Sequence, residues 1–226
     1  MLTMRKTAVA LLLVVLVGAS GFAHKPVSIG GVFDGPDTAA EVTDVDVSQV
    51  VYAALTAEHP ELWIRFEITE PIDLFVSLGI PVLDRLTDYR PIIAVLGPGM
   101  PAVEADVAIP AGLGGIDFDS RTVGEPRFFH EPFTGTDSWI LIEETVPLVE
   151  PGEYYVVARS PADEFGKLWV AVGTKERFGL QDVLRLPTIA REVRAFHEVA
   201  ADPDPDVWGR ILFLAAAALA IVLLAR

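Results

Sequence analysis

Apolar and polar residues alternate along several short segments of the chain, which is typical of β-strands with one buried face. The clearest segment is 62–68, where the apolar positions Leu62, Ile64 and Phe66 alternate with more polar ones. The other segments of strand character are 47–55, 72–80, 91–96, 127–130, 139–142, 153–159 and 167–172, with weaker fragments at 107–109 and 116–118. Because Pro- and Gly-containing turns join them and no helices intervene, we expect a mainly β fold, an antiparallel β-sandwich or jelly roll.

The connections between these segments indicate how the strands pair. The polar stretch 58–61 is expected to be a hairpin loop between the strands 47–55 and 62–68. After the Pro151-Gly152 turn, the strands 153–159 and 167–172 are expected to form the last hairpin. The segment 30–46 is rich in glycine and aspartate, and no strand is predicted there.

After Gly173 the apolar spacing changes to that of a helix. Because Pro187 interrupts the spacing, the region 174–200 is predicted to contain two short amphipathic helices. Two interpretations of their apolar face stay open. The face could pack on the sandwich, or the helices could lie at a membrane surface with Arg185, Arg191 and Arg194 on lipid headgroups.

The last stretch, 207–226, is predicted to be a transmembrane anchor. It runs from Ile211 to Ala225 without a polar residue, and a span of about 20 residues is reached when the helix starts near Val207. Trp208 then lies at the interface, and Arg226 marks the inner end. A buried core helix is the alternative, but an acidic, Pro-rich linker at 201–206 precedes the stretch.

Residues 1–23 are predicted to be a secretory signal peptide. Arg5 and Lys6 precede an apolar run, and small residues follow it, as a signal peptidase requires. Cleavage after Ala23 is expected, with a site near Ser20 as the rival and an uncleaved anchor as the other alternative. The region 24–173 is then an extracytoplasmic β-sandwich domain, tethered to the cell membrane by a single span.

Charge and cysteine content narrow the function further. All 32 acidic residues lie between residues 24 and 206, together with 13 of the 17 basic ones, so this region has a formal charge of −19. Such a field repels nucleic acid, which is therefore not expected as a partner. The chain has no cysteine, which excludes disulfides, thiolate metal sites and cysteine nucleophiles.

Several motifs carry a resemblance to known proteins. These motifs are Asp46-Val47-Ser48, Arg90-Pro91, Gly97-Pro98-Gly99, Glu131-Pro132-Phe133-Thr134 and Pro151-Gly152-Glu153-Tyr154-Tyr155-Val156. On these motifs the chain resembles an uncharacterised group of bacterial secreted, membrane-anchored β-sandwich proteins, which are distantly similar to the pre-peptidase C-terminal domain. The resemblance implies a non-catalytic accessory module.

One metal site is considered. If His24 is the mature N-terminus, its α-amine and imidazole form a chelating pair that suits Cu(II), and His130 with Glu131 would complete the ligands. The alternative is that a histidine follows the cleavage site by chance, while His59 and His197 are surface residues.

Other chemistry is weakly supported. The carboxylate pairs Asp34/Asp37, Asp44/Asp46 and Asp117/Asp119 lack the spacing of a calcium loop, and no catalytic motif is present, so no enzyme activity is expected. A glycan surface would need Trp63 or Trp169 to point outward. The preferred function is thus a membrane-tethered module that binds a protein, peptide or glycan without a cofactor, and the alternative is a copper-binding protein.

Overall fold

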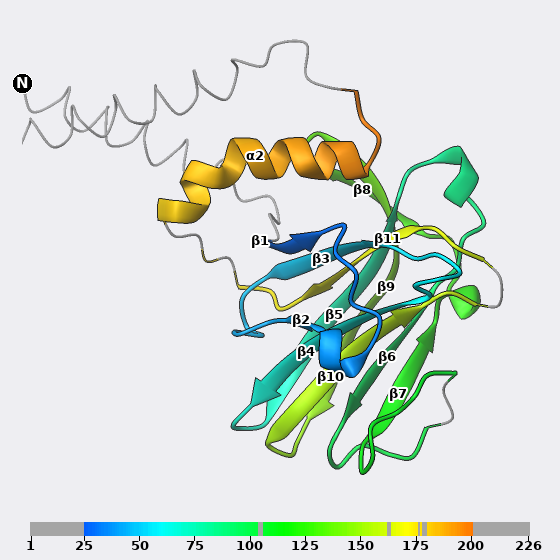
Figure 1. The fold of residues 1–226 in the computed structure, drawn as a ribbon, viewed down its shortest axis with the longest axis vertical. Coiled ribbons are helices and arrows are strands. Elements are labelled where there is room, and N and C mark those ends of the chain that lie inside the picture. Colours follow the sequence, from blue (N-terminus) through cyan, green and yellow to red (C-terminus); the bar gives the residue numbers. More distant parts are fainter. Residues whose placement is uncertain (1–24, 104–105, 162–163, 176, 178–179, 201–226) are drawn as a thin grey trace, which may run out of the picture.

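A computed structural model describes residues 25–103, 106–161, 164–175, 177 and 180–200 of the chain. In this part the fold is mainly β, with two mixed sheets in a sandwich-like arrangement and one α-helix (Figure 1). The six-stranded sheet has the order β1 (Lys25–Ile29), β3 (Gln49–Ala54), β11 (Lys167–Val172), β5 (Ile72–Pro81), β9 (Thr136–Leu148) and β8 (Arg127–Glu131). The five-stranded sheet has the order β2 (Ala40–Glu41), β4 (Glu61–Ile68), β10 (Gly152–Arg159), β6 (Ile92–Gly97) and β7 (Gly114–Asp119).

The predicted alternation accounts for the core between the two sheets. Every second residue of β4 and β5 points into it, among them Ile64, Phe66, Val76 and Leu78, which are all buried. Burial of such side chains contributes about 2 kcal/mol each, so a core of this size can hold the domain together without a disulfide. The strand predictions at 47–55, 62–68, 72–80, 91–96, 127–130, 153–159 and 167–172 are confirmed within two or three residues, whereas the weak fragment at 107–109 is not a strand.

The expectation of an antiparallel sandwich is wrong at two places. β1 pairs with β3 in parallel, and β2 pairs with β4 in parallel, so both sheets are mixed. Both parallel strands lie in the segment 25–46, most of which was expected to lack strands. The reason is that this segment passes from one sheet to the other before β3 begins, which lets β1 and β3 run in the same direction.

The two predicted hairpins are also wrong. β3 belongs to the six-stranded sheet and β4 to the five-stranded one, so the loop around Glu58 connects the sheets. The same holds for β10 and β11. The 3-10 helices η1 (Pro36–Thr38), η2 (Asp84–Leu86) and η3 (Ser120–Thr122) lie in other connections. A short polar loop can form a hairpin within one sheet or connect the two sheets. Its length alone does not show whether the strands on its two sides pair with each other.

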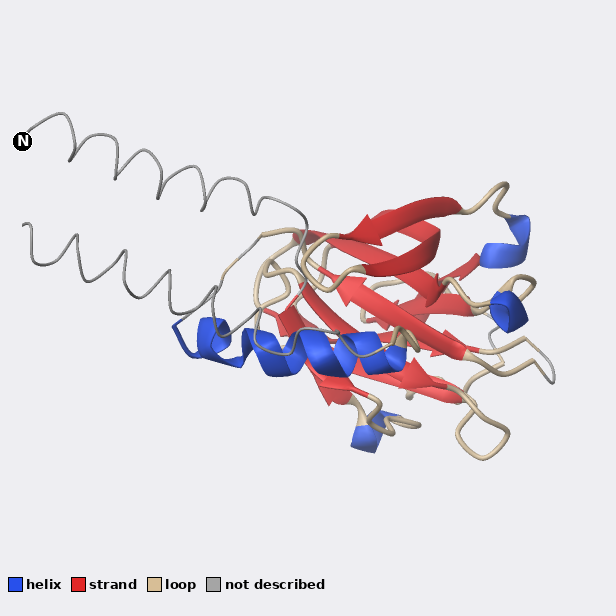
Figure 2. Cartoon of the chain, turned by 90° about the horizontal axis from the view of Figure 1, so that it is seen from above, coloured by secondary structure: helices blue, strands red, loops and turns tan. Residues whose placement is uncertain are grey.

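Helix α2 (Leu180–Phe196) is a single helix, not the two that Pro187 suggested. The proline lies inside it, and the helix bends in its first half (Figure 1). α2 lies along the outer side of the six-stranded sheet, where Figure 2 shows it from above. Its residues Ala190, Val193 and Phe196 are buried, so the interpretation that its apolar face packs on the sandwich is confirmed for this part.

Each sheet also has a second buried cluster on its outer face. Trp169 belongs to the cluster on the six-stranded sheet, next to α2. Trp63 and Tyr155 form the centre of the other, against which residues of the segment 103–113 pack. Both tryptophans lie on outer faces but are buried, so neither is exposed to solvent as a glycan-binding surface would require.

Among the described residues, none of the helices has the length and apolar character that a membrane crossing requires. The predicted signal peptide, linker and anchor at 1–23, 201–206 and 207–226 lie outside the described residues.

Candidate functional site

Strand β8 lies at one end of the six-stranded sheet and carries Phe128, the largest of the more than half-exposed apolar side chains in the described part. β8 forms a hairpin with β9 in which Phe128 is opposite Trp139 and His130 is opposite Asp137. Side chains alternate along a strand, so these four lie on one face of the sheet, the face that points toward the five-stranded sheet. We call Phe128, His130, Asp137 and Trp139 the aromatic edge.

The aromatic edge is partly exposed to solvent. Phe128 is 52 % exposed, although its neighbour Phe129 packs on the opposite face against the cluster of Trp169. The rings of Phe128 and Trp139 meet edge to face, with centroids 5.5 Å apart and planes at 71°. A well-packed aromatic pair that remains half exposed is the kind of anchor found in protein interfaces.

The other sheet edges in the described part are short or covered. β1 is contacted by α2, and β2 has two residues. β7 is approached by the preceding segment, whose Pro101 carbonyl accepts a hydrogen bond from Gly115 N–H. Proteins commonly cover or shorten edges in these ways to prevent pairing with other chains. β8 is a five-residue edge strand at the end of its sheet.

The polar groups of the aromatic edge are paired with each other. His130 Nδ1 lies 2.6 Å from a carboxylate oxygen of Asp137, and Arg127 binds Glu143 through two hydrogen bonds on the other face. Since Glu125 and Glu131 lie on or just before the same strand, the surroundings of β8 are acidic overall.

Two of the three predicted copper ligands lie in the described part, both on β8. His130 and Glu131 are consecutive residues of β8 and so point to opposite faces of the sheet. His24 lies outside the described residues. The copper prediction therefore stays a prediction.

The carboxylate pairs are held by basic side chains. Asp44 binds Arg177, Asp46 binds Lys175 and Asp117 binds Arg159. Hydrogen bonds from Arg121 keep the pKa of Asp119 below its ordinary value, and the hydrogen bond with His59 lowers that of Asp34. No group of three or more His, Asp or Glu side chains in the described residues is arranged to hold a metal ion.

A second polar cluster, which sequence reasoning missed, fixes the C-terminal end of α2. His197 was expected at the surface, yet it is 5 % exposed and lies 3.2 Å from Ser138 Oγ on β9. Trp169 Nε1–H donates to the same hydroxyl at 3.1 Å. Ser138 is itself buried, so this serine and histidine are closed to a substrate, and their role is to hold the helix.

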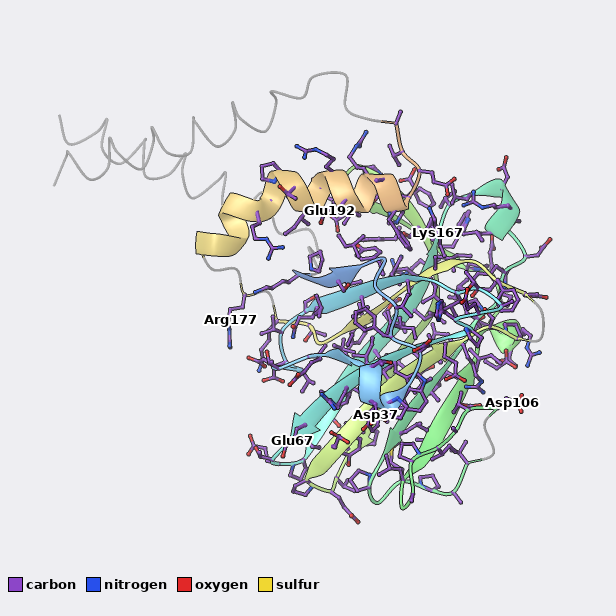
Figure 3. The ribbon with its side chains drawn as sticks, in the orientation of Figure 1. Asp37, Glu67, Asp106, Lys167, Arg177 and Glu192 are labelled. Atoms are coloured by element: carbon purple, nitrogen blue, oxygen red, sulfur yellow. The ribbon has the colours of Figure 1, made fainter. Side chains whose placement is uncertain are left out.

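The next residue, Glu198, adds two ion pairs to this attachment. It accepts hydrogen bonds from Arg85, which follows β5, and from Lys167 at the start of β11. Lys167 also donates to the carbonyl of Phe196 at the helix end, and it lies below that end in Figure 3. The one hint in the sequence was the spacing of Val193, Phe196 and His197, which places the histidine on the apolar side of the helix.

These features define a small mainly β, sandwich-like protein with an exposed aromatic edge. No family model and no curated protein matches the chain. Among solved structures it is weakly similar to the pre-peptidase C-terminal domain of a collagenase from Bacillus anthracis, with 13% identity, a TM-score of 0.32, and coverage of 58% of this chain and 91% of that one. A Cry1Da tryptic core variant from Bacillus thuringiensis has 10% identity and a TM-score of 0.27, and the match covers 62% of this chain and 25% of that one.

Proposed function

We propose that the protein is a non-catalytic, membrane-tethered extracytoplasmic module that binds an extended peptide segment of another protein along β8. The observation that carries the proposal is the aromatic edge: a terminal strand whose Phe128 is half exposed and contacts the ring of Trp139. A bound peptide would pair its backbone with β8 and place an apolar side chain on the aromatic pair. Strand addition of this kind combines main-chain hydrogen bonds with side-chain specificity.

The charge around β8 indicates which peptides would bind. Acidic residues outnumber basic ones beside the strand, and the region 24–206 has a formal charge of −19. A peptide with lysine or arginine on either side of an apolar anchor residue would complement this field, and it would associate faster at low ionic strength.

A glycan fits the same surface less well. Sugar rings stack on broad aromatic faces, whereas the planes of Phe128 and Trp139 meet at 71° and offer no shared flat face. The other aromatic pair, Trp63 and Tyr155, is buried under the segment 103–113.

The binding experiment uses a displayed library of random twelve-residue peptides, selected against the full chain. The enriched peptides are expected to be basic and to contain an aromatic or large aliphatic residue. Phe128→Ser should weaken their binding at least tenfold, about 1.4 kcal/mol, because it removes the anchor contact. The dissociation constants are measured by fluorescence polarisation.

Val149→Ser is the matched control, since Val149 is 61 % exposed and lies in the turn between β9 and β10. It should change the dissociation constant less than twofold. Hydrogen exchange at 127–131 should slow when the peptide is bound, because strand pairing protects amides. Equal losses in the two variants, unprotected β8 amides, or binding only to a glycan array would each contradict peptide binding at β8.

The tether can be tested separately. The predicted signal peptide and anchor place the domain outside the cytoplasmic membrane, with Arg226 on the inside. A protease added to intact cells or spheroplasts is expected to digest the domain and leave a short C-terminal fragment in the membrane. Immunoblotting with a C-terminal tag checks the fragment, and a domain that stays intact until the cells are lysed would refute this orientation.

A further inference from the structure

We propose that α2 is a pH-sensitive cover, whose C-terminal half is held on the six-stranded sheet by neutral His197 and is loosened when His197 takes up a proton. The helix end covers aromatic residues of the sheet. Phe196 meets Tyr52 edge to face at 5.2 Å, and His197 meets the same ring at 5.9 Å. Loosening would therefore uncover an apolar surface around Tyr52 and Trp169.

The hydrogen bonds around His197 determine its protonation state. Nδ1 lies 2.9 Å from the carbonyl oxygen of Val193, which can only accept, so Nδ1 carries the hydrogen. Nε2 must then accept, and the hydroxyl of Ser138 donates to it. The Ser138 oxygen is left to accept from Trp169 Nε1–H. All three polar groups are satisfied with a neutral imidazole.

A proton on Nε2 would break this arrangement. Nε2–H and Trp169 Nε1–H would both point at the Ser138 oxygen, whose own hydrogen would lose its acceptor. In addition, a positive charge would be buried, which costs free energy unless a partner compensates it.

The charged groups around His197 do not supply that compensation fully. Lys167 on β11 disfavours the positive charge, and Asp137 on β9 favours it. Asp137 is already paired with His130 on β8. Other titratable groups on the neighbouring elements include Arg194 within α2, Glu198 just after it, Arg85 in η2, Tyr52 in β3 and Glu131 in β8. Glu198 is bound by Arg85 and Lys167.

Burial lowers the pKa of His197 below its ordinary value of 6.5, and Lys167 acts in the same direction. The hydrogen bond to the Val193 carbonyl and the charge of Asp137 raise the pKa, but they do not cancel the effect of burial. A loosened helix binds more protons than a docked one, so docking is fully favoured above pH 6.5 and weakens as the pH falls below it. The Glu198 carboxylate affects docking of the helix in a lower pH range. Hydrogen bonds from Arg85 and Lys167 lower its pKa to about 2, so its contribution to docking is present above about pH 4.5 and is lost below it.

Amide hydrogen exchange tests whether α2 loosens at low pH. The full chain is kept in detergent micelles because of its apolar termini. Protection factors of the segment 188–200, corrected for intrinsic exchange rates, should fall up to about tenfold from pH 7.5 to 5.5, which is the ratio of protonated to neutral imidazole for a free histidine at the lower pH. Protection of β4 and β10 should stay constant. Unchanged protection of the segment 188–200 would overturn the proposal.

His197→Gln provides the sharpest variant, because its amide can accept from Ser138 but does not titrate. The segment should stay protected at both pH values, while the control His59→Gln, in a loop paired with Asp34, should keep the wild-type pH dependence. A pH-dependent loss that persists in His197→Gln would refute the role of His197. NMR of the wild-type imidazole gives an answer without a variant: a proton on Nδ1 and a pKa below 6.5 are expected, and a pKa at or above 6.5 contradicts the proposal.

Discussion

Ile64→Asp should destabilise the domain by about 3–5 kcal/mol at neutral pH, which is a large share of the stability of a typical domain. Ile64 is 1 % exposed and lies on the inner face of β4, opposite Val156 on β10 and Ala40 on β2. A carboxylate there would have no polar partner and would also leave a smaller side chain in the core. Chemical denaturation followed by circular dichroism measures the loss.

The pH dependence identifies the cause of that loss. A buried carboxylate has a pKa above its unfolded value of about 3.9, so the destabilisation should be larger at pH 7.5 than at pH 4.5. The free energy of unfolding of the variant is compared with that of wild type at the same pH, so the contributions of the other titratable groups cancel. Thr69→Asp, just beyond the end of the same strand and exposed, should change the free energy of unfolding by less than about 0.5 kcal/mol. Similar losses in the two variants would contradict the assignment of the buried face.

Trp63→Ala is expected to cost about 3–5 kcal/mol as well, although Trp63 does not lie between the sheets. Its side chain has no exposed surface and packs edge to face on Tyr155 at 5.5 Å, and its Nε1–H donates to Glu61 at 2.6 Å. Removing the indole would leave a cavity beneath the segment 103–113 and an unpaired carboxylate. Thermal or denaturant unfolding gives the magnitude.

Phe128→Ala is the matched aromatic substitution, because Phe128 is half exposed on β8. It should cost less than about 1 kcal/mol, since most of its ring is already in contact with water. If Trp63 were instead an exposed binding residue, its replacement would leave stability unchanged and reduce ligand binding. A loss of stability with Phe128→Ala equal to that with Trp63→Ala would mean that the aromatic edge is part of the core.

Much of the secondary structure could be predicted from the sequence, because the spacing of apolar residues is a local property. The alternation at 62–68 located β4 and its buried face at Ile64, and the change of period after Gly173 located α2. The proline inside that helix was misleading. Val193 and Phe196, which follow the proline, pack on the sheet and stabilise that part of the helix. Such tertiary contacts outweigh a single unfavourable residue.

The candidate site could be predicted only in part. The sequence predicted a short strand at 127–130 that contains Phe128, and it suggested His130 as a copper ligand and not as part of a peptide-binding surface. Phe128 is half exposed on the last strand of its sheet, and that place in the strand order is not encoded in the local sequence. His197 was expected at the surface but is buried. The spacing from Val193 and Phe196 hinted at the apolar side of the helix, but only the contact with Ser138 on β9 shows what buries it.

The sequence by itself determined where most of the strands and the helical region occur, which face of β4 is buried, and that the domain must hold together without disulfides. Only the tertiary structure decided that β3 and β4 belong to different sheets, that Trp63 and Trp169 are covered on the outer faces, and that Ser138 meets His197. The physical reason is the range of the interactions. A strand's period is encoded within a few neighbouring residues, whereas sheet pairing and outer-face burial depend on segments far apart in the chain, such as β9 and the end of α2, which are brought together only when the whole domain packs.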